Sequence, residues 1–213
     1  APAGATLDAG QIHDANGPLL SGLIRQIGAL PEPATRVADE SAATGDALAA
    51  AAVTADLVIT SGGVSVGDAD HVRHAIAERG RLEGFGIAVK PGKPVAWGRV
   101  GSTPLLALPG NPVSLFVTFV LFGAPMLRRL LGRRCTMPQP LHLPAGFRRL
   151  RPQARTEFLR VRVEQGELVP HEHQGSGILH ACAWADGLAC VPAGAVVDRC
   201  DPLPYYPVES LLD

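Results

Sequence analysis

Two lysines held close together are the first sign of chemistry in this sequence. Lys90 and Lys93 lie in the segment KPGKP at 90–94. Its prolines restrict the backbone, and Gly92 permits a sharp bend, so the two charges stay near each other despite their repulsion. Such a pair suits a multivalent oxyanion, and two solvated surface lysines on a turn are the alternative interpretation.

A glycine-rich loop provides a second group of candidates. The segment SGGVSVGD starts at Ser61 and contains Gly62, Gly63 and Ser65. Glycines allow backbone N–H groups to approach a ligand closely, and the start of the following helix favours an anion. A tight turn without a ligand is the alternative. The loop is not a Walker P-loop, because no Gly-Lys-Ser/Thr follows it.

The segment LPGNPVS at 108–114 resembles that loop in its position between an apolar run and a helix start. Asn111 or Ser114 could cap the helix. Either residue could instead face a ligand, leaving N–H groups and a hydroxyl directed into the same cleft. The sequence alone leaves both interpretations open.

Carboxylates beside the expected loops could hold a metal ion. Asp39, Glu40, Asp68 and Asp70 lie in or next to loops at strand ends. Two carboxylates together with phosphate oxygens suit Mg²⁺, which prefers hard oxygen ligands. Each aspartate could instead cap a helix or lie in a solvated loop, and we favour that interpretation for Asp68.

These residues need a scaffold of alternating strands and helices. Hydrophobic spacing and turn residues predict helices over 16–27, 44–55 and 69–79, followed by an apolar helix from 112. They predict strands over 33–39, 57–60, 85–89, 94–99 and 105–108. The alternation predicts an α/β fold with a layered, mostly parallel sheet over residues 1–135. Ligands gather at the carboxyl ends of such strands, so the three loops would line one crevice.

The pattern changes after Leu131. Residues 136–213 contain short alternating strand-like runs separated by Pro and Gly, which predicts a small all-β, barrel-like domain. The apolar stretch 112–127 is too short to span a bilayer and precedes Arg128 and Arg129, so we interpret it as a buried helix.

Composition excludes several classes of function. The formal net charge of the 213 residues is -1, without the basic stripe of a nucleic-acid-binding protein. The first residues lack the basic start and apolar run of a signal peptide. The four cysteines are too widely spaced for a typical zinc site and suit free thiols in a cytoplasmic protein. We therefore expect neither nucleic acid nor a membrane as a partner.

Together, SGGVSVGDAD, KPGKP and LPGNPVS resemble the molybdopterin molybdenumtransferase family, which includes bacterial MoeA proteins and the matching half of gephyrin. The segments RTEFLR at 155–160 and QGSG at 174–177 are similar to that family's C-terminal domain. The resemblance extends from about Gly10 to about Pro192. It implies a molybdopterin-binding α/β domain followed by a small β domain.

The resemblance also implies a function and a set of site residues. Family members insert molybdate into adenylylated molybdopterin and release AMP with the help of Mg²⁺. Asp39 and Asp70 match the acidic residues that would bind the metal and serve catalysis. The residues that match the molybdate-binding group are Lys90, Lys93, Ser114, Arg155 and Ser176. The two lysines would also serve catalysis, and Pro94 is a further substrate-binding candidate. The residues that would cradle the pterin or its phosphate are Ser61, Gly62, Gly63 and Ser65.

The sequence also departs from the family pattern. The usual Asp-Ser-Asn reads Asp14-Ala15-Asn16, and Ala154 replaces a glycine before the arginine segment. The resemblance implies two further N-terminal domains, a first strand ending in Thr-Gly-Asp-Glu, and a homodimer that completes the site. We therefore weigh a binding or scaffold fragment against an active transferase. A related domain with another nucleotide-like ligand, as in competence-damage proteins, is the third hypothesis.

Overall fold

The computed structural model describes residues 1, 4–38, 40–64 and 71–213. Its first part contains a four-stranded sheet with the order β1-β5-β4-β2. The strands are β1 (Val58–Ser61), β2 (Gly80–Phe85), β4 (Ala96–Val100) and β5 (Thr103–Leu108). Strand β1 runs parallel to β5, whereas β4 is antiparallel to both β5 and β2. The sheet is therefore mixed, and our prediction of a mostly parallel sheet was wrong.

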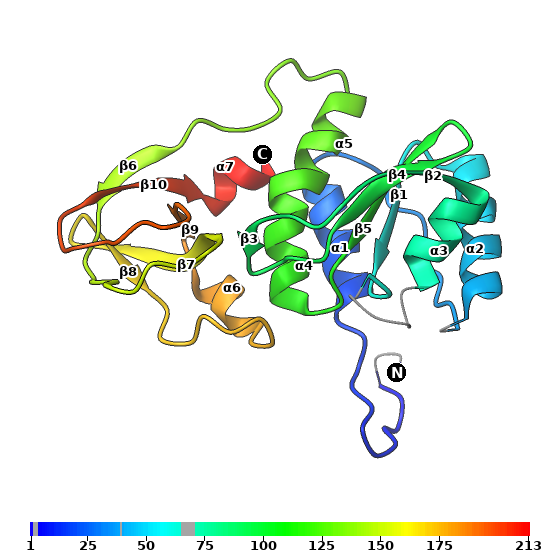
Figure 1. Ribbon diagram of the computed structural model, residues 1–213, viewed down its shortest axis with the longest axis horizontal. Coiled ribbons are helices and arrows are strands. Elements are labelled where there is room, and N and C mark those ends of the chain that lie inside the picture. The colour runs from blue at the N-terminus through cyan, green and yellow to red at the C-terminus, as the bar shows by residue number, and fades with distance from the viewer. Residues whose placement is uncertain (2–3, 39, 65–70) are drawn as a thin grey trace.

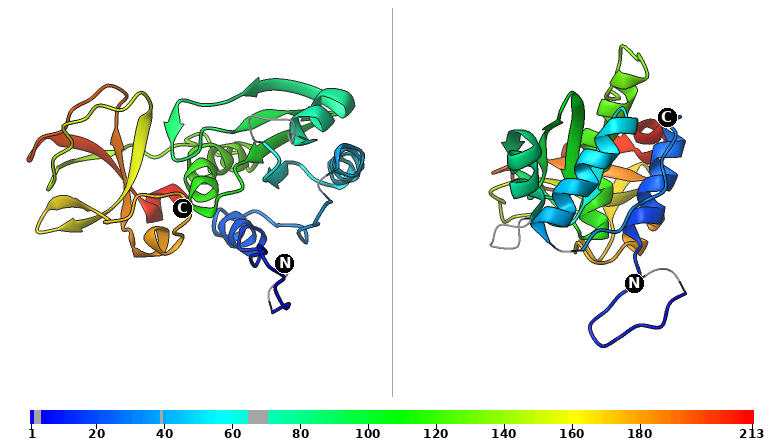
Figure 2. Two further views of the ribbon diagram at one scale, coloured as in Figure 1. Left: turned by 60° about the horizontal axis from the view of Figure 1, so that its bottom comes forward. Right: turned by 90° about the vertical axis from the view of Figure 1, so that its right-hand side faces the viewer.

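Side chains of β5 alternate between two helical layers, as the period of two along a strand requires. Leu106 and Leu108 pack towards α1 (Asn16–Gln26) and the apolar helix, whereas Leu105 and Ala107 pack towards α2 (Ser41–Thr54) and α3 (His71–Arg79). Figures 1 and 2 show α2 and α3 on one side of the sheet and α1 on the other. The predicted helices are confirmed, with boundaries shifted by a few residues.

One continuous helical segment connects the two halves of the chain. It consists of α4 (Pro112–Thr118), the π-helical turn η1 (Phe119–Gly123) and α5 (Ala124–Leu130). It is mostly apolar because it packs against the first sheet and also against Phe158, Leu188 and Leu211 from the second half. Figure 1 shows it between the two sheets. By length and composition it could cross a membrane, but 67% of its most apolar window is buried inside the protein, as in a core helix.

The second sheet has the strand order β3-β7-β9-β10-β6, with β8 paired to β7. The strands are β3 (Val89–Lys90), β6 (Leu141–Pro144), β7 (Thr156–Glu164), β8 (Glu167–Pro170), β9 (Gly187–Val191) and β10 (Pro202–Pro207). Strand β3 comes from the first half of the chain and joins this sheet parallel to β7. Residues from β7, β8, β9 and β10 fill a separate core.

The second half differs from the predicted all-β barrel in two respects. It includes two short helices, α6 (His180–Trp184) and α7 (Val208–Leu212). Strands β3 and β6 end the pairing path, and an isolated bridge between Ala145 and Leu168 links the segment after β6 to β8. Barrel-like closure by continuous strand pairing is therefore not shown. The strand predicted at 33–39 is also absent, since the described residues 33–38 form neither helix nor strand.

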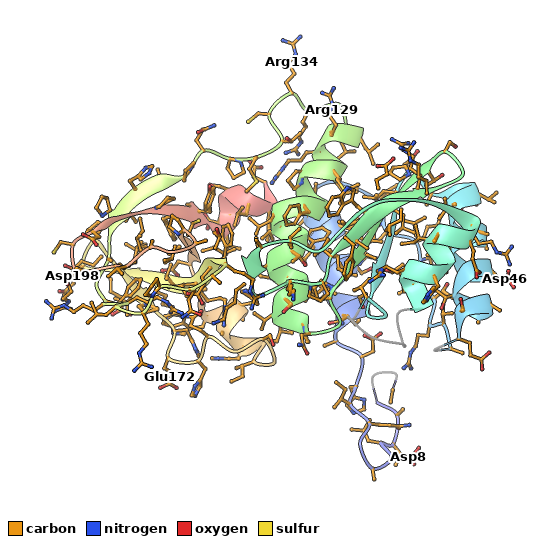
Figure 3. All side chains as sticks on the ribbon, viewed as in Figure 1. Asp8, Asp46, Arg129, Arg134, Glu172 and Asp198 are labelled. Atoms are coloured by element: carbon orange, nitrogen blue, oxygen red, sulfur yellow. The ribbon has the colours of Figure 1, made fainter. Side chains whose placement is uncertain are left out.

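Charged side chains lie mostly at the periphery of this frame. In Figure 3, labelled residues such as Asp46, Glu172 and Asp198 extend outwards from different elements. Among the residues that the structure describes, the buried polar side chains are Thr44, Ser114, Thr118, Arg128, Glu157 and Arg160. Because burying such a group is costly without a partner, this short set directs attention to particular places in the fold.

Candidate functional site

The carboxyl ends of β1 and β5 bring two candidate loops together. Ser61 pairs with Leu108 at the end of the parallel register, and the Gly62 N–H donates a hydrogen bond to the Leu108 carbonyl at 3.0 Å. A Cβ atom on Gly110 would lie 3.5 Å from the Gly62 Cα. The two loops therefore pack backbone against backbone.

Backbone conformation favours glycine at both Gly62 and Gly63, and close packing is a second reason at Gly63. Both have positive φ values, of 84° and 67°, which residues with a side chain rarely adopt. A Cβ atom on Gly63 would also lie 2.6 Å from a methyl carbon of Val72. The loop geometry thus explains both glycines, while the Ser61 side chain stays exposed.

Asn16 connects both loops to the start of helix α1. Its Nδ2 donates to the Gly110 carbonyl at 2.7 Å and to the Ser61 hydroxyl at 3.2 Å. The Asp14 carboxylate accepts hydrogen bonds from the backbone N–H groups of Asn16 and Gly17. In the sequence, Asn16 stood out as a helix start and as part of the segment Asp14-Ala15-Asn16, and neither interpretation revealed its bridging role.

The start of helix α4 forms the next part of the site. Asn111 precedes this helix without capping it, and its Nδ2 donates instead to the Ser176 hydroxyl at 3.2 Å. The Val113 N–H donates to the Ser176 carbonyl at 3.3 Å. A loop of the second half therefore docks on the first turn of α4, which places Ser176 beside the PGNP segment.

The lysine turn lies against the same helix. A Cβ atom on Gly92 would lie 2.3 Å from the Thr118 methyl carbon and 3.6 Å from the Ser114 carbonyl oxygen. Thr118 donates its hydroxyl hydrogen to that Ser114 carbonyl at 2.7 Å. Ser114 is 5% exposed, so the turn covers the helix surface where this residue lies. The peptide bond between Lys90 and Pro91 is cis.

The two lysines of the turn have different surroundings. Lys90 forms an ion pair with Glu157, with 2.9 Å between Nζ and Oε1. Lys93 is exposed, and within the described part of the chain no ion pair or hydrogen bond involves its ammonium group. They are the two lysines of the whole sequence, whose other seventeen basic residues are arginines.

Two arginines, the half-buried Arg155 and the buried Arg160, support the surroundings of the site. Arg155 donates to the Val89 carbonyl at 3.0 Å and so holds β3. Arg160 is 1% exposed and donates to the carbonyls of His173 and Gly175, directly before Ser176. Burial lowers the pKa of the Arg160 guanidinium. Arg160 thus positions the Ser176 loop, a role that its place in a strand-like run did not reveal.

These contacts bring most of the described candidate site residues around the first turns of helix α4. Ser61, Gly62 and Gly63 meet Ser176 through Asn16, Gly110 and Asn111, and the lysine turn meets Ser114 on the same helix. Asp39, Ser65 and Asp70 lie outside the described residues, so the metal ligands expected from the sequence stay a prediction. Among the described residues, no group of three or more His, Cys, Asp or Glu side chains could hold a metal ion.

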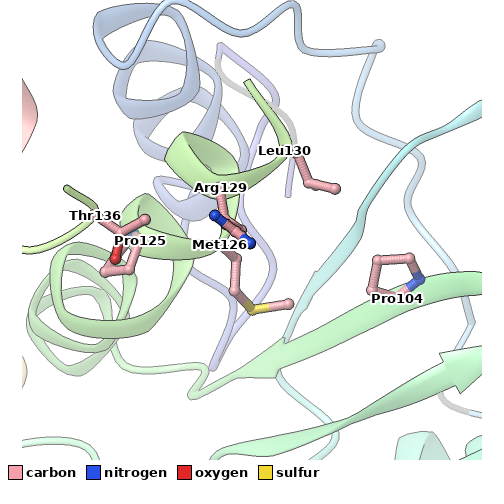
Figure 4. A pocket seen from close by; sticks show the side chains of 6 residues that line it. All are labelled: Pro104, Pro125, Met126, Arg129, Leu130 and Thr136. Carbon is pink, nitrogen blue, oxygen red and sulfur yellow. The ribbon is translucent and has the colours of Figure 1, made fainter. Parts of the chain in front are cut away.

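Two cavities lie elsewhere, towards the amino end of β5. One has a volume of about 400 Å³ and is mostly apolar, with Trp97, Phe122 and Met126 in its wall. The other, of about 330 Å³, shares Pro104, Pro125 and Met126 with it and also contacts Arg129 (Figure 4). Because Leu108 marks the opposite end of β5, these cavities are separate from the loops that follow β1 and β5.

Comparisons with known proteins identify the family of this chain. Residues 3–129 match the family described as a probable molybdopterin binding domain, and residues 142–207 match the MoeA C-terminal region, domain IV. The chain belongs to this molybdopterin-binding family and corresponds to a C-terminal portion of MoeA-like proteins.

Individual relatives carry a more specific name. Molybdopterin molybdenumtransferase 2 of Mycobacterium tuberculosis is 35% identical over 207 residues, which cover 91% of this chain and 50% of that protein. The molybdopterin molybdenumtransferase of Haemophilus influenzae is 38% identical over 142 residues, or 67% of this chain and 35% of that protein. A molybdopterin biosynthesis MoeA structure from Pyrococcus horikosii has a TM-score of 0.83 at 28% identity, covering 97% of this chain and 51% of that one. The chain thus spans about half the length, or less, of these relatives.

Proposed function

We propose that the chain forms the substrate-binding part of an enzyme that inserts molybdenum into adenylylated molybdopterin and releases AMP. The observation that carries this proposal is the convergence at helix α4 of the strand-end loops, the lysine turn and the Ser176 loop. Relatives named molybdopterin molybdenumtransferase support it.

Each group has a chemical role in this proposal. Molybdate is a tetrahedral dianion, so Lys90, Lys93 and Arg155 supply positive charge, while Ser114 and Ser176 supply hydroxyl donors. Pro94 shapes the turn. The backbone N–H groups around Ser61, Gly62 and Gly63 would hold the phosphate or pterin.

Magnesium belongs to the proposal through residues outside the described part. Asp39 and Asp70 would hold Mg²⁺ with oxygen ligands. The ion would offset charge on the phosphate as AMP leaves. Glu157 is already held by cations on both oxygens and is therefore a poor candidate ligand.

The test is an insertion assay with adenylylated molybdopterin, Mg²⁺ and molybdate, measuring AMP release and formation of active cofactor. Lys93→Ala is the informative variant, because the Lys93 side chain is exposed and makes no contact that the fold needs. Arg134→Ala removes an exposed cation far from the site and serves as the matched control (Figure 3). Turnover by wild type and control together with at least a tenfold loss in Lys93→Ala, about 1.4 kcal/mol, supports the proposal.

A non-catalytic binding part is the second candidate, favoured by the family that residues 3–129 match, whose description as a probable molybdopterin binding domain names binding alone. In that case wild type binds adenylylated molybdopterin but releases no AMP. The homodimer implied by the family resemblance is a further proposal. Sedimentation of the purified chain tests it directly.

A further inference from the structure

A buried carboxylate lies directly behind one lysine of the turn. Lys90 and Glu157 are register partners in the parallel pair of β3 and β7, and their charged atoms lie 2.9 Å apart. The Glu157 residue is 2% exposed. Its second oxygen lies 2.5 Å from Nη2 of Arg149. One carboxylate is thus shared by two cations from distant parts of the sequence.

The arrangement leaves Lys90 able to bind a ligand. Its side chain is 42% exposed, and an ammonium group has three N–H donors, one of which faces Glu157. The trio of Lys90, Arg149 and Glu157 retains a net charge of about +1, since two cations share one carboxylate. A free lysine side chain has a long flexible stem, whereas this one is fixed at its charged end.

Glu157 does not need Lys90 in order to be neutralised within its own sheet. Arg149 already provides a cation, and its backbone is fixed by paired hydrogen bonds with Val197. Lys90 reaches the same carboxylate from the short strand β3, which the lysine turn follows immediately. The second ion pair therefore fixes a residue of the turn to the second sheet.

We infer that Glu157 is a positioning residue, which holds the Lys90 ammonium at the place where the oxyanion binds. This inference rests on the proposed function. It adds that the binding geometry of the lysine turn depends on a carboxylate in the second half of the chain, which itself does not touch the oxyanion.

The sequence offers a direct readout, because Lys90 and Lys93 are its two lysines. Labelling the chain with ¹³C,¹⁵N-lysine gives two sets of side-chain NMR signals, and Lys93→Arg assigns them. The probe is molybdate alone, titrated against the whole chain. The main variant is Glu157→Gln, which keeps the size but removes the charge. Glu83→Gln is the control, since Glu83 pairs with Arg99 at 3.4 Å outside the site.

We expect Glu157→Gln to move the Lys90 signal towards that of a free lysine and to weaken molybdate binding about tenfold. The melting temperatures of wild type and Glu157→Gln are compared as well, because similar values exclude a merely structural effect. In a Lys90→Ala background, Glu157→Gln should change molybdate affinity less than about twofold, because the residue acts through Lys90. Glu157→Asp, which keeps the charge but shortens its reach, should fall between wild type and Glu157→Gln.

Different results overturn different statements. If molybdate shifts the Lys90 signal equally in wild type and Glu157→Gln, the positioning role is wrong and the proposed function stands. The positioning role is also wrong if Glu157→Gln weakens binding equally with and without Lys90. If molybdate moves neither lysine signal in wild type, the proposed function and the oxyanion role fail together. If Glu157→Gln does not fold, the graded comparison of Glu157→Asp with wild type decides the question.

Discussion

The side chain of Asn111 donates a hydrogen bond to the hydroxyl of Ser176, 3.2 Å away, and so connects the two halves of the chain. Asn111 stands before helix α4, whereas Ser176 lies in a loop between β8 and α6. The same helix shares a core with Phe158, Leu188 and Leu211 of the second half. The site therefore depends on a junction that is apolar inside and polar at its edge.

This junction leads to a first prediction. Asn111→Ala and Ser176→Ala should each lower the free energy of unfolding by about 0.5–1 kcal/mol, as expected for an exposed hydrogen bond. The double variant should lose less than the sum, because both changes remove the same contact. Urea denaturation of wild type, the two single variants and the double variant measures the free energy of unfolding of each. Strict additivity would show that the hydrogen bond contributes nothing.

Gly92 gives a second prediction. Its φ of 120° strains any residue with a side chain, and a Cβ atom would lie 2.3 Å from the Thr118 methyl carbon. Gly92→Ala should therefore cost about 2–4 kcal/mol and displace the lysine turn. Thermal unfolding and molybdate titration are the measurements.

Gly86→Ala is the matched control for this change. Gly86 also has a positive φ, of 78°, but a Cβ atom added to it would have no other atom within 4 Å. Gly86→Ala should therefore lower the free energy of unfolding by about 1 kcal/mol, which is the cost of backbone strain alone. Adding Thr118→Ser to Gly92→Ala removes the overlapping methyl group and should restore part of the stability. Equal losses in Gly92→Ala and Gly86→Ala would mean that the overlap with Thr118 is unimportant.

The helices of the first half were predictable because their signals are local. Hydrophobic spacing and the Asn16-Gly17-Pro18 start identified α1, and the apolar run from Pro112 identified the central helix. The direction of the strands was not predicted correctly. Two residues, Gly101 and Ser102, separate β4 from β5, and parallel strands need a crossover of a dozen or more. That short connection was a readable signal for an antiparallel pair.

The short helices of the second half had no comparable signal. Helices α6 and α7 have five residues each, too few to be stable alone, and they form around the buried side chains of Ala181 and Leu211. The strand expected at 33–39 failed for a related reason. Its residues 33–38 pair with no neighbouring strand in the described fold, and Pro33 cannot donate a ladder hydrogen bond.

The residue types of the candidate site were predictable from the sequence, but the residues that hold them in place were not. Glycines, lysines and the Ser176 segment stand out as motifs in the sequence. The roles of Asn16, Glu157 and Arg160 depend on Gly110, Lys90 and His173 respectively, which are far from them in the sequence and which the fold alone brings close. Glu157 and Arg160 are charged residues within an apolar strand-like run, and that is the one signal that could have identified these two supporting residues.

Arg160 gives a third prediction. Its guanidinium is buried and donates to the carbonyls of His173 and Gly175. Arg160→Met keeps most of the volume but leaves these carbonyls without their donor, which should cost about 2–4 kcal/mol. Hydrogen exchange should rise over 171–177, because the loop that carries Ser176 loses its support. Arg148→Met, at an exposed ion pair with Asp198, is the control and should cost less than about 1 kcal/mol. Unchanged exchange over 171–177 would contradict the support assigned to Arg160.

The four thiols give a prediction about reactivity. Burial raises the pKa of the Cys182 thiol from 9.0 to about 11, against the opposing effect of Arg160, and burial also raises the pKa of Cys190. Cys135 and Cys200 are exposed. At pH 8 a thiol with a pKa of 11 is about 0.1% thiolate, so iodoacetamide should label Cys135 and Cys200 far sooner than Cys182. Mass spectrometry of timed samples measures the order, and early labelling of Cys182 would contradict its burial.

The raised pKa of Cys182 also predicts how stability changes with pH. The unfolded chain loses this proton near pH 9 and the folded chain near pH 11. The thiol therefore contributes fully below about pH 9, and its contribution falls as the pH rises towards 11, by at most about 3 kcal/mol. Urea denaturation from about pH 8 to 11 should show a steeper alkaline loss of unfolding free energy in wild type than in Cys182→Ala. Cys182→Ala is less stable at pH 8, so each protein is compared with its own value at that pH. Parallel curves for the two proteins would mean that Cys182 ionises alike in the folded and unfolded chain.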